Sequence, residues 1–419
     1  MQAVILAAGE SSRFYPFNGI HKTMVSLLGK PILAHTIDGL KNAGIKELII
    51  VTRDDGVVKD YFSDGKKFGV NIDYVVQKES TGMGDALLLV KEHIKGDFIL
   101  LGGNHINSNV LVNRLIDNKK DVDGVVLVNQ RLNTWEYGVI KLTGQRVLQV
   151  VEKPKKGEEP SKLCLISAYL LPINFLSVLE KTKAHQYSFE EALDKFIKTT
   201  KVTAVKIKEE IATLKYPWDL LTLKNMLMKS IKGYRGKNVE IAKSAEVMGD
   251  VAVGDNVKIM EGARIKGPCY IGDNVIIGNN VLLRGGVDVE ENATVGAYME
   301  VKNSLIMQGS STHSGFIGDS IVGQKCKVGG DFSTANVRID RDTVKVEVKG
   351  EKVDSMLKYL GTMIGDGVKV GIKVSTMPGV IIGENSVIGP STTVIRNVAS
   401  NARYYTKFQE IVEEKNEKR

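Results

Sequence analysis

The sequence has 419 residues, with 57 Lys and Arg against 49 Asp and Glu, which gives a formal net charge of +8 at pH 7. A single hydrophobic core usually stops growing at about 250–300 residues, so this length favours two domains. The positive charge is scattered and no nucleic-acid-binding module accompanies it, so we do not expect DNA or RNA as a partner. The three cysteines, Cys164, Cys269 and Cys326, form no C-x-x-C pair, which argues against a zinc site or a disulfide framework.

The apolar stretches of the sequence are all shorter than the roughly 18 residues that a membrane-spanning helix needs. The strand-like run at 3–6 follows Met1 almost at once, without a charged leader. We therefore expect a cytoplasmic protein that does not bind a membrane.

Up to about residue 232, short β-branched runs alternate with longer amphipathic stretches. The runs lie at 3–8, 47–52, 73–77, 97–102 and 123–128. Helical periodicity is found between them, at 31–44 and 84–94. Strands joined by crossover helices predict an α/β, Rossmann-like domain with a parallel, doubly wound sheet, which binds ligands beyond the carboxyl ends of its strands.

After about residue 240 an aliphatic side chain occupies every sixth position. The series is Ile241, Val247, Val253, Ile259, Ile265, Ile271, Ile277, Leu283, Val289, Val295 and Val301. It resumes at Ile364, Val370, Ile382, Ile388 and Val394, with Thr376 as the exception. This hexapeptide period resembles that of left-handed parallel β-helices, in which glycines such as Gly254 and Gly272 are expected to open the corners.

Residues 331–359 interrupt the hexapeptide period, and 343–353 alternate around Gly350 like a β-hairpin. Such an excursion from a solenoid tends to line a binding face or an oligomer contact. We therefore expect an α/β domain over 1–232, an all-β left-handed β-helix over 233–402 and a charged tail over 403–419.

Motifs of the first domain resemble those of sugar-1-phosphate nucleotidylyltransferases. The segment 6–14, LAAGESSRF, is similar to the L-A-A-G-x-G-T-R signature of that family. Further matches follow in the family order: His21-Lys22 before Gly29-Lys30-Pro31, Gln77 and 81–86, 137–140, 151–154, and 216–221.

The resemblance implies that a phosphate oxygen of a sugar-1-phosphate attacks the α-phosphorus of UTP or dTTP and that pyrophosphate leaves. The protein would mainly position the reactants and neutralise charge. Arg13 and Lys22 would hold the phosphates as catalytic residues, and Gln77 and Gly82 would face the base. Glu152 with Lys153 would contact the sugar phosphate, and the other substrate-binding positions implied are Ala8, Gly9 and Gly138.

Family members hold Mg²⁺ with two aspartates, and these positions align here with Asn104 and Thr213. Neutral oxygens are poor substitutes for carboxylates around a hard dication. Ser11 also replaces the second glycine of the loop, and Leu165 and Ser167 stand where N-A-G lies in the family. The domain is thus either an active, Mg²⁺-dependent transferase or a degenerate copy with a regulatory or structural role.

The β-helix resembles the acetyltransferase domain of bifunctional N-acetylglucosamine-1-phosphate uridylyltransferases, especially their archaeal relatives. Residues 311–320 match N-H-L-x-Y-x-G-D, with His313 at the catalytic base. Arg284, Lys302 and Lys358 fall in further motifs of that family, and Asn336 falls in another and would be catalytic together with His313. His313 would take a proton from a sugar amine that attacks acetyl-CoA, amide donors would stabilise the oxyanion, and the cations would bind the phosphate.

This second resemblance also has departures, at Phe316, Lys327, 330–332 and Val337. The leading hypothesis is a bifunctional enzyme that acetylates glucosamine- or galactosamine-1-phosphate and transfers a nucleotide from UTP or dTTP. The resemblance also implies a homotrimer, in which the β-helices of neighbouring subunits share each active site. The alternatives are a regulatory paralogue that binds sugar nucleotide, and a monofunctional nucleotidylyltransferase with a structural β-helix.

Overall fold

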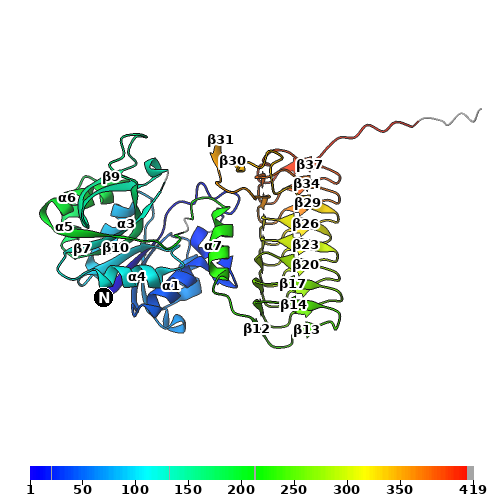
Figure 1. The fold of residues 1–419 in the computed structure, drawn as a ribbon, viewed down its shortest axis with the longest axis horizontal. Helices are drawn as coiled ribbons and strands as arrows, with labels where there is room; N and C mark the ends of the chain where they lie inside the picture. Colours follow the sequence, from blue (N-terminus) through cyan, green and yellow to red (C-terminus); the bar gives the residue numbers. More distant parts are fainter. Residues whose placement is uncertain (20, 132, 212–213, 413–419) are drawn as a thin grey trace, which may run out of the picture. The chain divides into compact units, whose positions relative to one another are not determined.

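The computed structural model describes residues 1–19, 21–131, 133–211 and 214–412 (Figure 1). The chain forms two compact units. Unit 1 comprises Met1–Ser12, Gly19–Ser26 and Lys30–Leu214, and unit 2 comprises Arg13–Asn18, Leu27–Gly29 and Lys215–Arg419. Helix α7 (Asp219–Met228) therefore clusters with the C-terminal unit. The functional domain limits at 232 and 402 stay a prediction.

In the described part of unit 1, nine strands form one sheet in the order β5-β4-β1-β6-β10-β7-β11-β9-β8. Their bounds are β1 (Gln2–Ala7), β4 (Glu47–Thr52), β5 (Asn71–Val76), β6 (Phe98–Gly102), β7 (Gly124–Gln130), β8 (Gly138–Thr143), β9 (Arg146–Glu152), β10 (Leu163–Leu171) and β11 (Val202–Lys206). The sheet is mixed and not fully parallel as predicted, because β10 runs antiparallel to both β6 and β7. A continuous apolar run such as β10 reveals burial on two faces but not direction.

Helices cover both faces of this sheet. They are α1 (Ile32–Asn42), α2 (Val57–Phe62), α3 (Met83–Leu89), α4 (Ser108–Asp117), α5 (Phe175–Glu180) and α6 (Ser188–Thr199). Successive residues of β1 point to opposite faces. Val4 packs in a core cluster with residues of α3, α5 and α6, whereas Ile5 packs with residues of α1 and α4.

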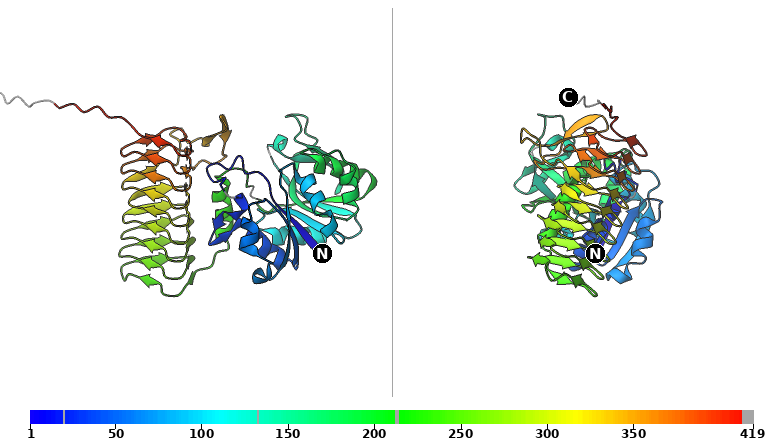
Figure 2. Two further views of the ribbon diagram at one scale, coloured as in Figure 1. Left: turned by 180° about the vertical axis from the view of Figure 1, so that it is seen from behind. Right: turned by 90° about the vertical axis from the view of Figure 1, so that its right-hand side faces the viewer.

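Unit 2 is built on a left-handed parallel β-helix of three sheets, whose stacked coils are seen in Figure 2. The first face contains β12 (Tyr234–Arg235), β15 (Val251–Val253), β18 (Cys269–Ile271), β21 (Val287–Val289), β24 (Leu305–Ile306), β27 (Ile321–Val322), β32 (Met363–Ile364) and β35 (Ile381–Ile382). The second contains β13 (Glu240–Ile241), β16 (Lys258–Ile259), β19 (Ile276–Ile277), β22 (Thr294–Val295), β25 (Ser311–Thr312), β28 (Lys327–Val328), β33 (Lys369–Val370), β36 (Val387–Ile388) and β38 (Arg403–Tyr404). The third contains β14 (Glu246–Met248), β17 (Arg264–Lys266), β20 (Leu282–Arg284), β23 (Met299–Lys302), β26 (Gly315–Gly318), β29 (Phe332–Thr334), β34 (Ser375–Thr376) and β37 (Thr393–Val394).

Most side chains of the hexapeptide series are buried in the core of the β-helix. An exception is Val247, which is 39% exposed on the first coil. The period is lost after Val301 because the coils shorten: Asn256 and Asn274 bond one coil apart at a separation of 18 residues, whereas Asn303 and Asp319 do so at 16. A shorter coil keeps the strands in register but shifts the inward positions along the sequence.

The corners of the β-helix differ from the expectation. Asparagines, such as Asn274 at φ 58°, take the left-handed conformation there, because their short polar side chains tolerate it. Gly254 and Gly272 serve the close stacking of coils instead. A Cβ on Gly272 would lie 2.7 Å from the backbone nitrogen of Glu291.

The expected hairpin is present as β30 (Lys345–Val348) and β31 (Glu351–Asp354), which pair antiparallel around Gly350. Strand β38 extends the second face into the segment that the sequence assigns to the charged tail, whose residues 413–419 lie outside the described part. No helix within the described residues is both long and apolar enough to cross a membrane.

Candidate functional site

The glycine-rich loop of unit 1 follows strand β1 directly. Ala8 is buried, while the space above Gly9 is open, since a Cβ there would meet no atom within 4 Å. Further along, the backbone N–H of Lys22 donates to Ser11 Oγ at 3.4 Å, and the Lys22 ammonium donates to the carbonyl of Leu214 at 2.7 Å. Unit 1 thus brings Lys22 and this loop together, whereas Arg13 is exposed and clusters with unit 2.

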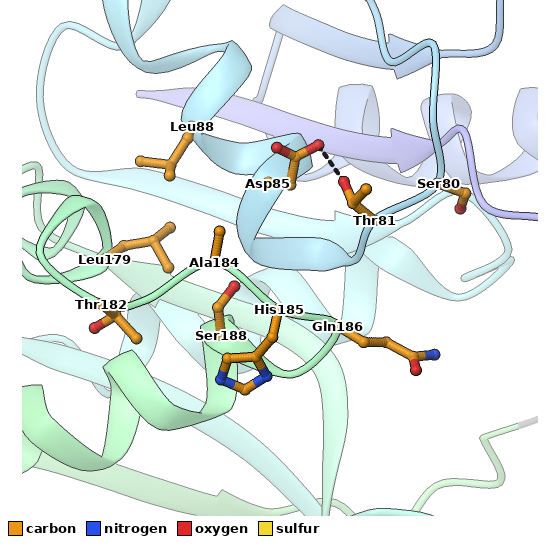
Figure 3. Close-up of a pocket in the computed structure, with 10 residues that line it drawn as sticks. All are labelled: Ser80, Thr81, Asp85, Leu88, Leu179, Thr182, Ala184, His185, Gln186 and Ser188. Carbon is orange, nitrogen blue, oxygen red and sulfur yellow. Dashed lines mark hydrogen bonds between the residues drawn. The ribbon is translucent and has the colours of Figure 1, made fainter.

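The residues predicted to face the base form one local network. Buried Gln77 donates from its amide to Asp85 at 2.9 Å and to the carbonyl of Gly82 at 3.4 Å. Thr81 donates to the same carboxylate at 2.6 Å, as Figure 3 shows. Gly82 has φ 125°, and a Cβ there would lie 2.6 Å from the carbonyl oxygen of Gln186. Only glycine therefore fits this turn without strain.

A pocket of about 510 Å³ lies beside this network, between α3 and the segment that leads into α6 (Figure 3). Its lining residues are Ser80, Thr81, Asp85, Leu88, Leu179, Thr182, Ala184, His185, Gln186 and Ser188. Gln77 and Gly82 are not among these lining residues. The pocket therefore adjoins the predicted base-binding residues but is not formed by them.

The residues predicted to contact the sugar phosphate also lie together in unit 1. Gly138 on β8 is the register partner of Glu152 on β9, and a Cβ on Gly138 would lie 2.8 Å from Glu152 Oε2. The neighbouring Lys153 donates to the Tyr187 hydroxyl at 2.9 Å and lies 4.6 Å from the centre of that ring.

Burial, and next the charge of Glu190, raise the pKa of Glu152 to about 7, while Lys153 opposes the shift. The pKa of Glu190 is raised as well, mainly by burial. Sequence reasoning missed Glu190 and Tyr187, because they come from the start of α6 and match no motif of the family.

The altered metal position follows strand β6. Asn104 Oδ1 would lie 2.9 Å from a Cβ on Gly102. The buried His105 places Nε2 3.0 Å from the carbonyl of Ser167, and its Nδ1 has no partner among the described residues. Burial lowers the pKa of His105 to about 4, so its ring is neutral at pH 7 and fits a structural role.

A divalent metal needs more oxygen ligands, and in particular carboxylates, than the position of Asn104 offers. In the part of the chain that the structure describes, no group of three or more His, Cys, Asp and Glu could hold a metal ion. The second altered position, Thr213, lies outside the described residues. A neutral amide oxygen beside a neutral histidine does not fit Mg²⁺, which prefers carboxylates.

On the β-helix, the predicted phosphate-binding residues stack on the third face. Arg284 on β20 is the register partner of Lys302 on β23, and Lys302 is the partner of Gly318 on β26. Adjacent strands lie about 4.8 Å apart, so the two cations project from neighbouring coils. Glu300 accepts from Arg284 Nε at 2.7 Å.

Lys302 and Asn336 meet at one carboxylate, that of Asp319. Asp319 Oδ2 lies 3.1 Å from the Lys302 ammonium and accepts from the Asn336 amide at 2.5 Å. The Lys302 ammonium also lies 4.5 Å from the centre of the Tyr359 ring, and exposed Lys358 precedes that tyrosine. We refer to Lys302, Asp319 and Asn336 as the carboxylate cluster. The G-D that ends the motif at 311–320 was the sequence signal for Asp319, although no role was assigned to it.

His313 is not part of the carboxylate cluster within one chain. It is exposed at the corner between β25 and β26, where a Cβ on Gly330 would lie 3.5 Å from its Nδ1. Gly318, which is in register with Lys302, follows His313 by five positions, or at most about 16 Å of extended chain. His313 and the carboxylate cluster therefore lie at opposite ends of the third face.

Comparison with known proteins covers the whole chain. Residues 2–218 match the nucleotidyl transferase family, and residues 361–396 match the bacterial transferase hexapeptide family (six repeats). The "Bifunctional protein GlmU" of Methanococcus maripaludis (strain C7) is 38% identical over 422 residues, which cover 99% of this chain and 100% of that protein. The "Bifunctional sugar-1-phosphate nucleotidylyltransferase/acetyltransferase" of Sulfurisphaera tokodaii is 30% identical over 412 residues, or 95% and 98% of the two chains.

Proposed function

The chain belongs to the family of bifunctional sugar-1-phosphate nucleotidylyltransferase/acetyltransferases of nucleotide-sugar biosynthesis, and we propose that its β-helix acetylates an amino sugar-1-phosphate with acetyl-CoA. Glucosamine- and galactosamine-1-phosphate are the substrates that we propose. One observation carries the proposal: Arg284 stacks in register with Lys302 of the carboxylate cluster on one face of the β-helix. Two stacked cations suit a phosphate dianion.

In this proposal the sugar amine attacks the thioester carbonyl carbon of acetyl-CoA. His313 takes the proton of the amine, the tetrahedral intermediate collapses with cleavage of the C–S bond, and the imidazolium returns that proton to the departing sulfur, so that CoA leaves as a thiol while the amide forms. The Asn336 amide would be a donor near the reacting groups, and Lys358 would add a further cation for the phosphate. His313 is exposed at its corner, so its imidazole is accessible to a substrate.

The amine and the phosphate of the substrate are carried by neighbouring carbons of one ring, only a few ångströms apart. His313 precedes β26, and Lys302 is in register with the last residue of that strand, Gly318, so the two residues lie toward opposite ends of one short strand. We also propose that the protein is a homotrimer with cyclic symmetry, in which neighbouring subunits share each acetylation site, as the family implies.

For unit 1 we propose transfer of a nucleotide from UTP or dTTP to a sugar-1-phosphate. The open loop at Gly9, the network around Gln77 and the pair of Glu152 with Lys153 support it. Lys22 and Arg13 would neutralise phosphate charge, and Ala8, Gly82 and Gly138 would allow close approach of the substrates. The family implies Mg²⁺ in this reaction, but the described residues do not fit it, so no step is derived through the metal.

A second candidate for unit 1 is a binding domain that has lost catalysis, and the neutral Asn104 favours it. A third is a nucleotidylyltransferase whose β-helix serves assembly only. That the protein is cytoplasmic also stays a prediction.

An assay in two parts separates these candidates. Release of CoA thiol from acetyl-CoA with either amino sugar-1-phosphate supports acetylation, and His313→Ala should lower kcat by about 10²–10⁴-fold. His185→Ala, at an exposed histidine of unit 1 paired with Glu191, is the matched control. Pyrophosphate release from UTP or dTTP with a sugar-1-phosphate tests the nucleotidyl reaction. If neither product forms with a broad panel of sugars, the binding-protein candidate replaces our proposal.

A further inference from the structure

A buried lysine of helix α7 is connected to the carboxylate cluster. Lys224 is fully buried, and its ammonium donates to the carbonyl of Gly286 and, at 3.0 Å, to Asn303 Oδ1. Asn303 Nδ2 in turn donates to Asp319 Oδ1 at 2.7 Å. We propose that Lys224 is a positioning residue of the acetyl-transfer site, which orients Lys302 and Asn336 through Asn303 and Asp319. This inference rests on the proposed acetylation.

Asn303 can make this connection in one orientation only. An ammonium has no acceptor and an ionised carboxylate has no donor, so the amide oxygen must face Lys224 and the amide nitrogen must face Asp319. A flipped amide would place an NH₂ against the ammonium and an oxygen against the carboxylate. The chemistry of the neighbours therefore fixes the rotamer of Asn303, which sits at a corner with φ 45°.

Asp319 has little freedom once Asn303 is fixed. Its side chain is 3% exposed, and both oxygens are engaged: Oδ1 by Asn303, and Oδ2 by Lys302 and Asn336. Hydrogen bonds to a buried carboxylate are strong and directional. The side chains of Lys302 and Asn336 are therefore held by a group that does not itself reach the substrate.

The groups around the Lys224 ammonium are two hydrogen-bond acceptors and a nearby carboxylate. Burial lowers the pKa of Lys224, and the nearby Asp288 carboxylate is the main opposing influence. Asp288 is itself fully buried and accepts from the backbone N–H of Leu28 at 3.0 Å. Replacement of Lys224 by an apolar residue would leave the Gly286 carbonyl and Asn303 Oδ1 without this donor, and Asn303 would be free to rotate.

The structural alternative is that Lys224 only anchors α7 to the β-helix. Lys224→Met keeps the length and apolar character of the stem and removes the charge. We expect it to raise KM for the amino sugar-1-phosphate about tenfold, with a smaller change in kcat and no change in KM for acetyl-CoA. Lys224→Arg, which keeps the charge, should recover part of the effect.

Ser386→Ala is the matched control, because buried Ser386 donates to the carbonyl of Ala399 on a coil that lies outside this network. It should lower stability without a change in KM. If Lys224→Met folds poorly, Asn303→Gly breaks the same connection from a half-buried corner without backbone strain at φ 45°, and it should raise the same KM.

A double-mutant cycle decides between positioning and anchoring. If Lys224 acts through Lys302, then Lys224→Met should raise KM little further in a Lys302→Met background, whereas two independent effects would multiply. Multiplicative effects, or an unchanged KM in both Lys224→Met and Asn303→Gly, would overturn the inference. If the wild-type protein releases no CoA thiol, the proposed acetylation fails first, and that result is distinct from an active wild type with unaffected variants.

Discussion

The Lys302 ammonium and the Asp319 carboxylate form an ion pair of 3.1 Å in which the side chain of Asp319 is 3% exposed and that of Lys302 is 25% exposed. The pair joins β23 to the corner that follows β26, one coil further along. The carboxylate is thus held inside the wall of the β-helix, while the lysine still reaches the surface. This arrangement favours a fixed cation that is available to a ligand.

Asp319→Asn should destabilise unit 2 by about 1–3 kcal/mol. An amide offers one acceptor oxygen, and its NH₂ would face either Asn303 or the pair of Lys302 and Asn336, which are all donors. Chemical denaturation measures the change in the free energy of unfolding. Asp340→Asn, which removes the exposed partner of Arg338, should leave the free energy of unfolding almost unchanged. Equal effects of the two variants would show that the buried contacts of Asp319 are not important for stability.

Glu152 should give unit 1 a pH-dependent stability. Its pKa is about 7 in the folded chain against a usual 4.5, so the folded state binds more protons than the unfolded state between these values. The free energy of unfolding should therefore fall as pH rises from about 4.5 through 7. Glu152→Gln should flatten this dependence of stability on pH. Glu190→Gln removes a like charge and so should lower the pKa of Glu152, and the fall in stability should then end at a lower pH. Denaturation curves at several pH values test this, and an unchanged slope in Glu152→Gln would refute it.

Gly82→Ala should destabilise unit 1 by about 1–3 kcal/mol and weaken nucleotide binding. The new Cβ would require a left-handed conformation at φ 125° and would lie 2.6 Å from the carbonyl oxygen of Gln186. Thermal unfolding and calorimetric titration with UTP or dTTP measure the two effects. Gly96→Ala is the control, since a Cβ there meets no atom within 4 Å. Full stability in Gly82→Ala would mean that the loop relaxes at little cost.

Asn104→Asp should increase Mg²⁺-dependent pyrophosphate release, by about tenfold or more at a fixed Mg²⁺ concentration. The substitution places a carboxylate where the family has one, and even indirect changes around a metal commonly alter activity 10–100-fold. Steady-state rates across a Mg²⁺ titration measure the change. An equal rate and Mg²⁺ dependence in wild type and variant would show that Asn104 does not occupy a metal-binding position.

Much of the fold could be predicted from the sequence. The features that allowed this were the hexapeptide period, the alternation around Gly350 and the order of the family motifs. Each inward position of a β-helix meets nearly the same surroundings, so a short local rule repeats and can be read along the chain. The same locality explains why Gln77, Gly82 and Asp85, which lie within eight residues of one another, were recognisable as one group.

Only the tertiary structure decided the direction of β10, the approach of Glu190 to Glu152, and the burial of Lys224. Lys224 and Asn303 are 79 residues apart in the chain, and their contact depends on how α7 packs against a coil. A lysine in an amphipathic helix looks like a solvated surface charge in the sequence. Whether it is buried depends on the energy of contacts between distant segments, which no local pattern encodes.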